Sequence, residues 1–127
     1  MRTLGIDYGQ KKIGLAFAEG SLAEPYKVLR VGSDEEALIK LGKVVEEERV
    51  ERIVVGISEA QMGGKSKKFG LSLRERLRTP VEFFDETLST QDAKRLSFQS
   101  GVSRKKRKQM EDAFAATIML QSYLDNV

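Results

Sequence analysis

The segment that most constrains the fold is Arg52–Ile57, in which every residue after the arginine is apolar. Apart from Gly56, these apolar residues are β-branched, and an unbroken run of this kind is typical of a β-strand that is buried on both faces. Such a strand needs packed side chains above and below its sheet. The chain is therefore expected to adopt an α/β fold, with helices on both sides of a sheet that contains parallel strands.

Helical patterns precede and follow this strand. Ser33 and Glu36 form a capping box, with serine at the N-cap and glutamate three residues on. The helix that it opens carries its apolar residues in one stripe at helical spacing: Ala37, Leu38, Leu41, Val44 and Val45. After a glycine-bearing loop at 58–66, a second helix repeats apolar residues every four positions and is predicted to end before Pro80: Phe69, Leu73 and Leu77.

The end of the chain adds one strand and two helices. Residues 81–84 predict a strand, and a helix is expected to begin at Ser89–Asp92 and to run to Gly101. The last helix has a predicted buried stripe of small and apolar residues: Ala113, Ala116, Thr117, Leu120 and Leu124.

The start of the chain predicts three strands, at 3–8, 13–18 and 27–31. A turn at 9–12 and a polar break at 20–25 connect them, and both are too short for crossover helices. These strands should form an antiparallel meander, whereas the two later strands are separated by helices and should add in parallel. We expect a mixed five-stranded sheet flanked by helices, in a single domain of residues 1–127.

Composition excludes several kinds of site and location. The chain contains no cysteine and no histidine, so disulfides, thiolate chemistry and imidazole bases are unavailable to it. No apolar run approaches the ~18–20 residues that a membrane span requires. Asp7 interrupts the first apolar stretch, which is unlike a signal peptide. We therefore expect a cytoplasmic protein that has no membrane partner.

Two acidic positions fall on or directly after predicted strands. Leu4 and Ile6 share one face of the first strand, and Asp7 lies on the other, where burial of a carboxylate is costly unless it is paired or binds a metal. At the end of the last strand, Asp85 follows the face of Phe83, and Glu86 follows the face of Phe84. Because both faces carry an aromatic residue, the strand pattern does not choose between Asp85 and Glu86.

The third acidic position is Asp112, on the last helix. Ala115 and Ala116 lie three and four residues further on, and such small side chains would let the helix approach the sheet and bring Asp112 towards Asp7. The alternative is that Glu111 and Asp112 only favour the positive end of the helix dipole. Three carboxylates from separate elements, without histidine or cysteine, favour a hard divalent cation, Mg²⁺ or Mn²⁺.

A dense basic run directly precedes Asp112: Arg104, Lys105, Lys106, Arg107 and Lys108. Cations at the start of a helix oppose its dipole, so this run is predicted to bind phosphate. Lys11, Lys12 and the amides around Gly9 are further candidates for phosphate binding. For the blocks at 11–12 and 65–68 the alternative is a solvated charged face, and for Gly9 it is an ordinary hairpin glycine. An acidic metal cluster beside a basic strip predicts phosphodiester cleavage on nucleic acid.

Three motifs resemble those of the YqgF/RuvX family of RNase H-like nucleases. The first is Gly5-Ile6-Asp7-Tyr8-Gly9 followed by Ile13-Gly14-Leu15-Ala16. The second is Asp85-Glu86-Thr87-Leu88-Ser89-Thr90, and the third joins residues 101–108 to Asp112 and Ala115-Ala116. The resemblance implies an RNase H-like fold. It also implies that Asp7, Glu86 and Asp112 are the catalytic and metal-binding acids, with Asp85 as a neighbour of the site.

The resemblance also implies a function, which is maturation of the 5′ end of pre-16S rRNA in ribosome biogenesis with a two-metal site of Mg²⁺ or Mn²⁺. The older assignment for the family is resolution of four-way DNA junctions. Junction resolution needs two symmetric cuts and hence a dimer, whereas a monomer can process an end. RNA processing is preferred on the resemblance, and a monomer or a weak homodimer is expected.

Two other classes of function stay open. Thr87 replaces an arginine that the family usually has, and residues 57–64 lack its proline and Asp-Gly pair, which keeps a non-catalytic RNA-binding factor as an alternative. Gly5–Gly9 also resembles the first phosphate motif of actin-like ATPases and sugar kinases. Those proteins enclose a nucleotide between two such domains, and 127 residues supply only one.

Overall fold

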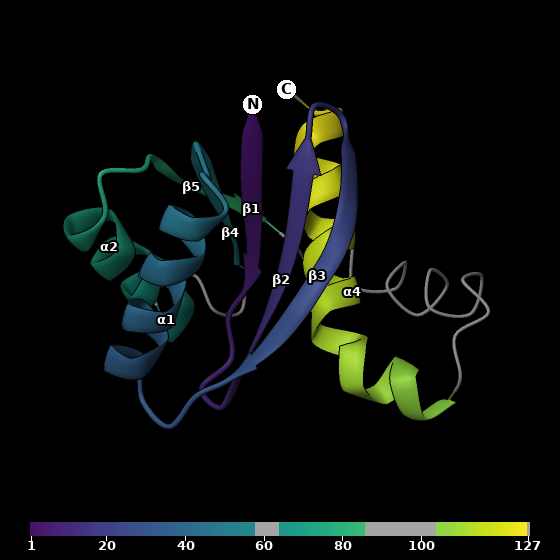
Figure 1. Ribbon diagram of the computed structural model, residues 1–127, viewed down its shortest axis with the longest axis horizontal. Helices are drawn as coiled ribbons and strands as arrows, with labels where there is room; N and C mark the ends of the chain where they lie inside the picture. The colour runs from purple at the N-terminus through teal and green to yellow at the C-terminus, as the bar shows by residue number, and fades with distance from the viewer. Residues whose placement is uncertain (58–63, 86–103, 127) are drawn as a thin grey trace.

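A five-stranded mixed sheet organises the chain, and the computed structural model describes residues 1–57, 64–85 and 104–126 (Figure 1). The strand order is β3-β2-β1-β4-β5. The first three strands are antiparallel, β4 runs parallel to β1, and β5 runs parallel to β4, so the predicted sheet is confirmed. The bounds are β1 (Arg2–Asp7), β2 (Lys12–Glu19), β3 (Leu22–Arg30), β4 (Arg52–Ile57) and β5 (Val81–Asp85).

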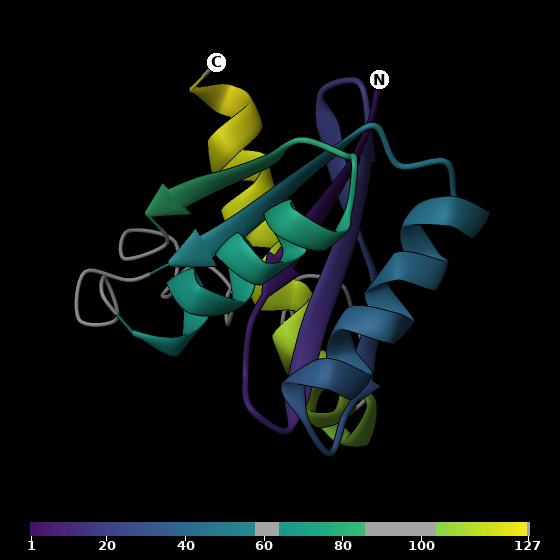
Figure 2. The same cartoon turned by 90° about the vertical axis from the view of Figure 1, so that its left-hand side faces the viewer.

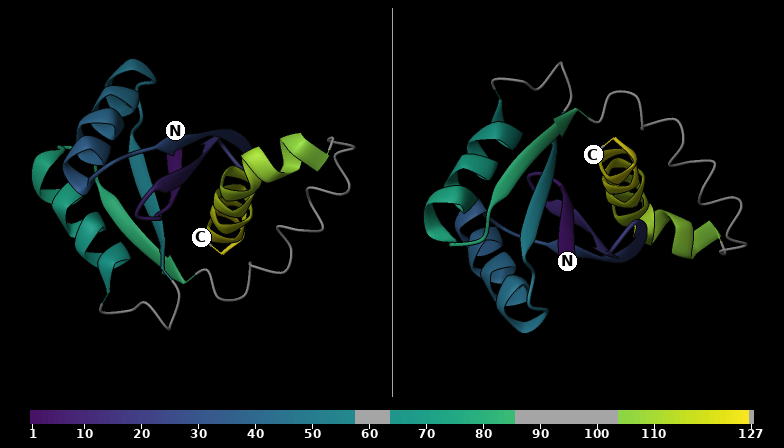
Figure 3. Two further views of the ribbon diagram at one scale, coloured as in Figure 1. Left: turned by 90° about the horizontal axis from the view of Figure 1, so that it is seen from below. Right: turned by 90° about the horizontal axis from the view of Figure 1, so that it is seen from above.

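Helices cover both faces of this sheet. On one side lie α1 (Asp34–Glu47) and α2 (Lys65–Arg76), and on the other lies α4 (Arg104–Asp125). Figure 2 looks onto the side of α1 and α2, and the end-on views of Figure 3 show the sheet between those two helices and α4. No helix in the described part of the chain is long and apolar enough to cross a membrane.

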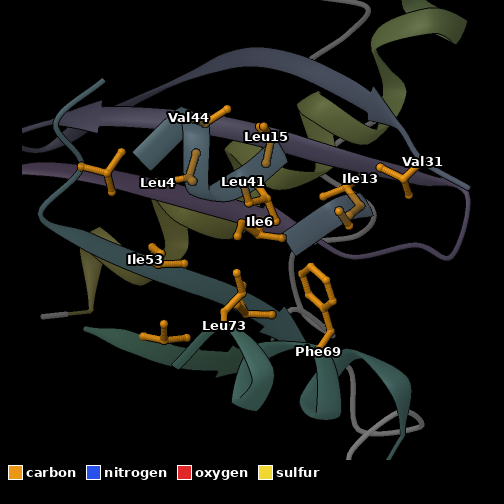
Figure 4. Packing of buried hydrophobic residues seen from close by; sticks show 14 of the residues in the cluster. Leu4, Ile6, Ile13, Leu15, Val31, Leu41, Val44, Ile53, Phe69 and Leu73 are labelled. Atoms are coloured by element: carbon orange, nitrogen blue, oxygen red, sulfur yellow. The ribbon is translucent and has the colours of Figure 1, made fainter. Parts of the chain in front are cut away.

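Each face of the sheet has its own hydrophobic core. Ile53 and Val55 of β4 belong to the larger core under α1 and α2, whereas Val54 belongs to the core under α4. Figure 4 shows side chains of the larger core, where Leu41 of α1 and Leu73 of α2 meet the strands. The prediction that this strand is buried on both faces is therefore confirmed.

The predicted start of α1 is also confirmed. The Oγ of Ser33 accepts a hydrogen bond from the backbone N–H of Glu36 at 3.1 Å, and the Glu36 carboxylate accepts one from the N–H of Gly32. A serine at this position typically stabilises a helix by about 1 kcal/mol relative to alanine. The capping box thus orders the entry into α1.

The predicted start of β3, at residue 27, was wrong. β3 begins at Leu22 and runs through Pro25, within the expected polar break. Among the described strands, β3 lies at an edge of the sheet and pairs with β2 alone. Pro25 is aligned with Ala16, at an irregularity between Leu15 and Ala16. Proline lacks an N–H but is tolerated at bulges and in edge strands, so the ladder continues past it.

Other boundaries differ by a few residues. The expected loop at 58–66 is too long, since α2 begins at Lys65. That helix ends at Arg76 and Leu77 is its C-cap, while β5 extends one residue further than expected, to Asp85. The predicted helix from residue 89 to Gly101 lies outside the described residues.

Two strand glycines set the distance between α4 and the sheet. A Cβ atom placed on Gly14 of β2 would lie 1.9 Å from the carbonyl oxygen of Asp112, and one on Gly5 of β1 would lie 2.9 Å from the Cβ of Leu120. We expected small residues on the helix to permit this approach, and Ala116 is indeed fully buried there. The closest contact, however, depends on glycine in the strands.

The contact at Gly14 gives a prediction about stability. Gly14→Ala would force a backbone displacement of α4, and overpacking of this kind typically costs about 1–3 kcal/mol. Gly42→Ala in α1 is the matched control, because its Cβ would only touch the Leu77 side chain at 3.7 Å. That change should instead stabilise the helix by about 0.5–1 kcal/mol. Urea unfolding followed by circular dichroism measures both, and a Gly14→Ala protein as stable as the parent would contradict the contact.

Candidate functional site

Asp7 ends β1 on the face of the sheet that α4 covers. Leu4 and Ile6 belong to the opposite core, whereas Gly5 lies against α4, so alternation places Asp7 on the α4 side. The cross-strand neighbours of Asp7 are Gly14 in β2 and Gly56 in β4. Neither neighbour has a side chain, so another segment can approach the sheet closely at these two positions.

The backbone of Asp112 lies at one of these two positions. The carbonyl group of Asp112 packs against Gly14, the cross-strand partner of Asp7. Two residues that are far apart in the sequence are thereby brought to the same end of the same face. The Asp112 side chain is half-buried there.

The end of β5 places Asp85, one of the two acidic candidates that the sequence left open. Phe84 is aligned with Gly56, and its ring meets that of Tyr123 of α4 edge-on at 5.9 Å, so Phe84 is on the Asp7 side. Phe83 points to the other side, where it lies against Gly70 of α2. Asp85 follows the alternation of Phe83 and is aligned with Ile57 of the opposite core. Asp85 is therefore directed away from Asp7, and Glu86 lies outside the described residues.

Burial raises the pKa of the Asp112 carboxyl above its ordinary value. The positive charge of Lys12 opposes this shift, Glu111 adds to it, and Arg30 opposes it more weakly. Lys12 and Arg30 are aligned with each other across β2 and β3. Lys12 was a candidate from the sequence, whereas Arg30 was missed because its position beside Lys12 depends on a strand register that no local pattern fixes.

The basic run lies at the start of α4, whose first turns reach beyond the sheet (Figure 1). Arg104, Lys105, Lys106 and Arg107 are in the helix, but their side chains are outside the described part of the structure. Lys108 is exposed and lies one turn before Asp112.

The turn between β1 and β2 is tight at Gly9, where a Cβ atom would lie 2.5 Å from the carbonyl oxygen of Lys12. Glycine is required here by close approach of the backbone, and Lys11 and Lys12 are exposed beside it. A cleft of about 380 Å³ adjoins the turn and is lined by Tyr8, Gly9, Gln10, Lys65 and Ser66. Tyr8, Gln10 and Ser66 were not singled out from the sequence.

Tyr8 is fixed at this cleft by contacts on two sides. Its ring stacks on Phe69 at 4.7 Å, and its hydroxyl donates a hydrogen bond to Asp34 at 2.6 Å. Burial, together with the adjacent Asp34 carboxylate, raises the pKa of Tyr8 to about 12. Tyr8 is thus a neutral, positioned side chain at any physiological pH.

The oxygen donors here are of the type that Mg²⁺ and Mn²⁺ prefer. Within residues 1–57, 64–85 and 104–126, no three acidic side chains form a group that could hold a metal ion. Asp7 and Asp112 are the two predicted metal-binding acids in those ranges. The third, Glu86, is outside them, so the structure leaves the complete donor set as a prediction.

The fold is similar to that of a protein whose structure has been solved with a Holliday junction. Thermus thermophilus RuvC, in complex with a Holliday junction substrate, matches 99% of this chain and 96% of its own with a TM-score of 0.63. The sequence identity is 17%, so this likeness concerns the fold alone. The sheet, its covering helices and this match define a protein with the RNase H-like fold.

Sequence comparisons give the family. A model described as "RuvX: Holliday junction resolvase" matches residues 1–126. A relative from Caldanaerobacter subterraneus is 42% identical over 135 residues, covering 99% of this chain and 97% of the relative. Another, from Syntrophomonas wolfei, is 38% identical over 133 residues, covering 98% and 94%. Both are described as candidate pre-16S rRNA nucleases. The chain belongs to the RuvX family, which confirms the resemblance seen in its motifs.

The raised pKa of Asp112 predicts a pH-dependent effect on stability. Its folded-state pKa lies above the ordinary value of 3.8, so the folded protein holds this proton more tightly than the unfolded chain. Ionisation of Asp112 therefore lowers the free energy of unfolding, with no penalty below pH 3.8 and the full penalty above the folded-state pKa. Without metal, Asp112→Asn should raise the melting temperature at pH 7, and the gain should disappear as the pH falls to 3.8.

Thermal unfolding in a chelating buffer measures this effect. Glu111→Gln is the matched control, because it removes an exposed carboxylate that makes only a secondary contribution to the Asp112 shift, and it should raise the melting temperature by much less than Asp112→Asn does. An Asp112→Asn protein that melts at or below the temperature of the parent at pH 7 would contradict the desolvation of Asp112.

Proposed function

We propose that this protein is a metal-dependent nuclease that processes the 5′ end of pre-16S rRNA. The observation that carries the proposal is the contact of Asp112 with Gly14, which is the cross-strand partner of Asp7. A structural helix has no need to bring a half-buried carboxylate to this position. Its raised pKa indicates that the fold bears a cost for it, as is common at functional sites.

Asp7, Glu86 and Asp112 would hold Mg²⁺ or Mn²⁺, which would supply Lewis-acid activation of water and neutralise charge on the phosphate. Glu86 is taken from the family motif. The alternation of β5 supports this choice over Asp85, since it puts Phe84 on the Asp7 side and Asp85 on the opposite side.

The basic side chains would position the substrate. Lys12 and Arg30 lie near enough to Asp112 to influence its pKa, so a phosphate bound between them would be close to the acids. Arg104–Lys108 would contact the sugar-phosphate backbone of the nucleic acid further from the acidic residues. Contacts of this kind fix the position and orientation of a nucleic acid without reading its sequence. The chain has no histidine, so no imidazole base takes part.

The relatives' descriptions favour RNA over branched DNA as the substrate. The family model's description names junction resolution instead, which requires two coordinated cuts and hence two subunits. We infer that the substrate is RNA, because a monomer with one acidic site is sufficient for end processing. The protein would meet this RNA in the cytoplasm.

Replacement of Asp7 tests the proposal. Asp7→Asn keeps the size of the side chain and removes its charge, and should slow Mg²⁺- or Mn²⁺-dependent cleavage of a 5′-extended small-subunit rRNA precursor by about a hundredfold or more. Binding of the same RNA should change little, since the basic residues remain. Glu111→Gln, an exposed carboxylate beside Asp112, should cleave at the parental rate.

A four-way DNA junction is assayed beside the RNA. Cleavage of the RNA alone, lost in Asp7→Asn, is the expected result. If the junction is cut symmetrically and the RNA is not cleaved, the activity is junction resolution and the proposal of rRNA processing is wrong. If the RNA is bound but neither substrate is cut, the proposal is wrong and the chain is an RNA-binding factor.

A further inference from the structure

Two basic residues face each other across β2 and β3 at the end of the sheet where Asp7 and Asp112 lie. Lys12 begins β2, Arg30 ends β3, and the two are aligned with each other. Lys12 is two residues before Gly14 on the same strand, so it lies on the same face, which α4 covers. Both cations act to lower the pKa of Asp112, which supports their placement on its side of the sheet.

The scaffold does not neutralise these two cations. In the described part of the chain, neither Lys12 nor Arg30 forms an ion pair with an acidic side chain, and both residues are exposed. Like charges that face each other across two strands repel, and an anion bound between them would remove this cost. The aligned pair therefore favours an anionic ligand.

The backbone at Arg30 is held by contacts with two other segments. Its carbonyl oxygen accepts a hydrogen bond from the Nζ of Lys40 at 3.0 Å, and the N–H of Val31 donates one to the carbonyl oxygen of Lys11 at 3.0 Å. Lys40 is in turn paired with Glu36 of the capping box at 3.2 Å. These contacts tie the end of β3 to α1 and to the β1–β2 turn. A cation on a backbone supported in this way can hold a ligand in a defined position.

The aligned pair is displaced from the acids along the strands. Asp7 is aligned with Gly14, and successive residues on one face of a strand are about 7 Å apart, so the backbone of Lys12 lies about that far beyond the level of Asp7. Arg30 is on β3, one strand further from β1. A displacement of this size is on the order of one nucleotide of an extended strand, and basic surfaces follow the backbone of such a strand.

We propose that Lys12 and Arg30 together clamp the phosphate next to the one that is cleaved, so that the bound strand runs from the acids across the ends of β2 and β3. The charge of the cleaved phosphate is left to the metal ions that the acids would hold. Arg30 is then a positioning residue, and a good substrate needs a further phosphodiester on this side of the cleaved bond. The position relative to that bond rests on the proposed function, whereas phosphate binding by the two cations does not.

Replacement of Arg30 tests the clamp by cleavage kinetics on an oligoribonucleotide that carries the cleavage site. A contact with a phosphate that does not react is equally strong before and during the reaction, so Arg30→Gln should raise KM by about tenfold and leave kcat nearly unchanged. Lys27→Gln is the matched control. Lys27 is also on β3, but it is aligned with Leu15 of the opposite core and so lies on the other face. A fall in kcat at unchanged KM for Arg30→Gln, or equal effects of the two replacements, would overturn the inference.

A neutral linkage in the substrate locates the contact. A methylphosphonate replaces one charged phosphate, and it is placed on each side of the cleaved bond in turn. On one side it should raise KM of the parent protein by about tenfold, and Arg30→Gln should then add less than about twofold, because both changes remove the same contact. If the two effects multiply on both sides, Arg30 does not bind the neighbouring phosphate.

Binding by the Asp7→Asn protein without metal separates this inference from the proposed function. Each phosphate contact with a single strand contributes about 0.7 to the slope of log affinity against log salt concentration, so Arg30→Gln should lower the slope by that amount and Lys27→Gln should not. If the parent cleaves RNA but Arg30→Gln leaves the slope unchanged, the clamp is wrong and the nuclease proposal stands. If the slope falls but the parent cleaves nothing, the phosphate contact stands, and the nuclease proposal fails together with the position assigned from it.

Discussion

The contact between α4 and the glycines of β1 and β2 determines the geometry of one whole side of the molecule. The backbone of Asp112 packs closely against Gly14. Leu120, two turns further along the helix, packs closely against Gly5. A side chain at either strand position would push the helix outward, because interiors are too densely packed to absorb an extra atom without movement. The same contact that closes the second core therefore places the backbone of Asp112 against Gly14, the cross-strand neighbour of Asp7.

The candidate site carries a cost in stability. Asp112 is held where burial disfavours its charge, and the positive charges of Lys12 and Arg30 only partly offset this. The residues aligned with Asp7 on the two neighbouring strands are both glycines, which have no side chain to pack. Proteins commonly accept local costs of this kind at functional sites and recover the stability elsewhere, here in the larger core under α1 and α2.

Much of this arrangement could be predicted from the sequence. The apolar strand Arg52–Ile57 and the capping box at Ser33 are local signals, and the structure bears both out. The start of β3 could not be found locally, because Pro25 is tolerated only through the edge position and irregular pairing of that strand. Arg30 was missed for a related reason, since its position beside Lys12 depends on how β2 and β3 pair.

The most direct test of the account is to locate a bound metal ion. Mn²⁺ is paramagnetic and broadens the NMR signals of nearby nuclei, so a titration reports which amides lie around it. We expect the amides of Asp7, Gly14 and Asp112, from three separate elements, to broaden together at one metal concentration and to remain sharp in Asp7→Asn. Broadening confined to a single element, or unchanged by Asp7→Asn, would contradict a shared metal site.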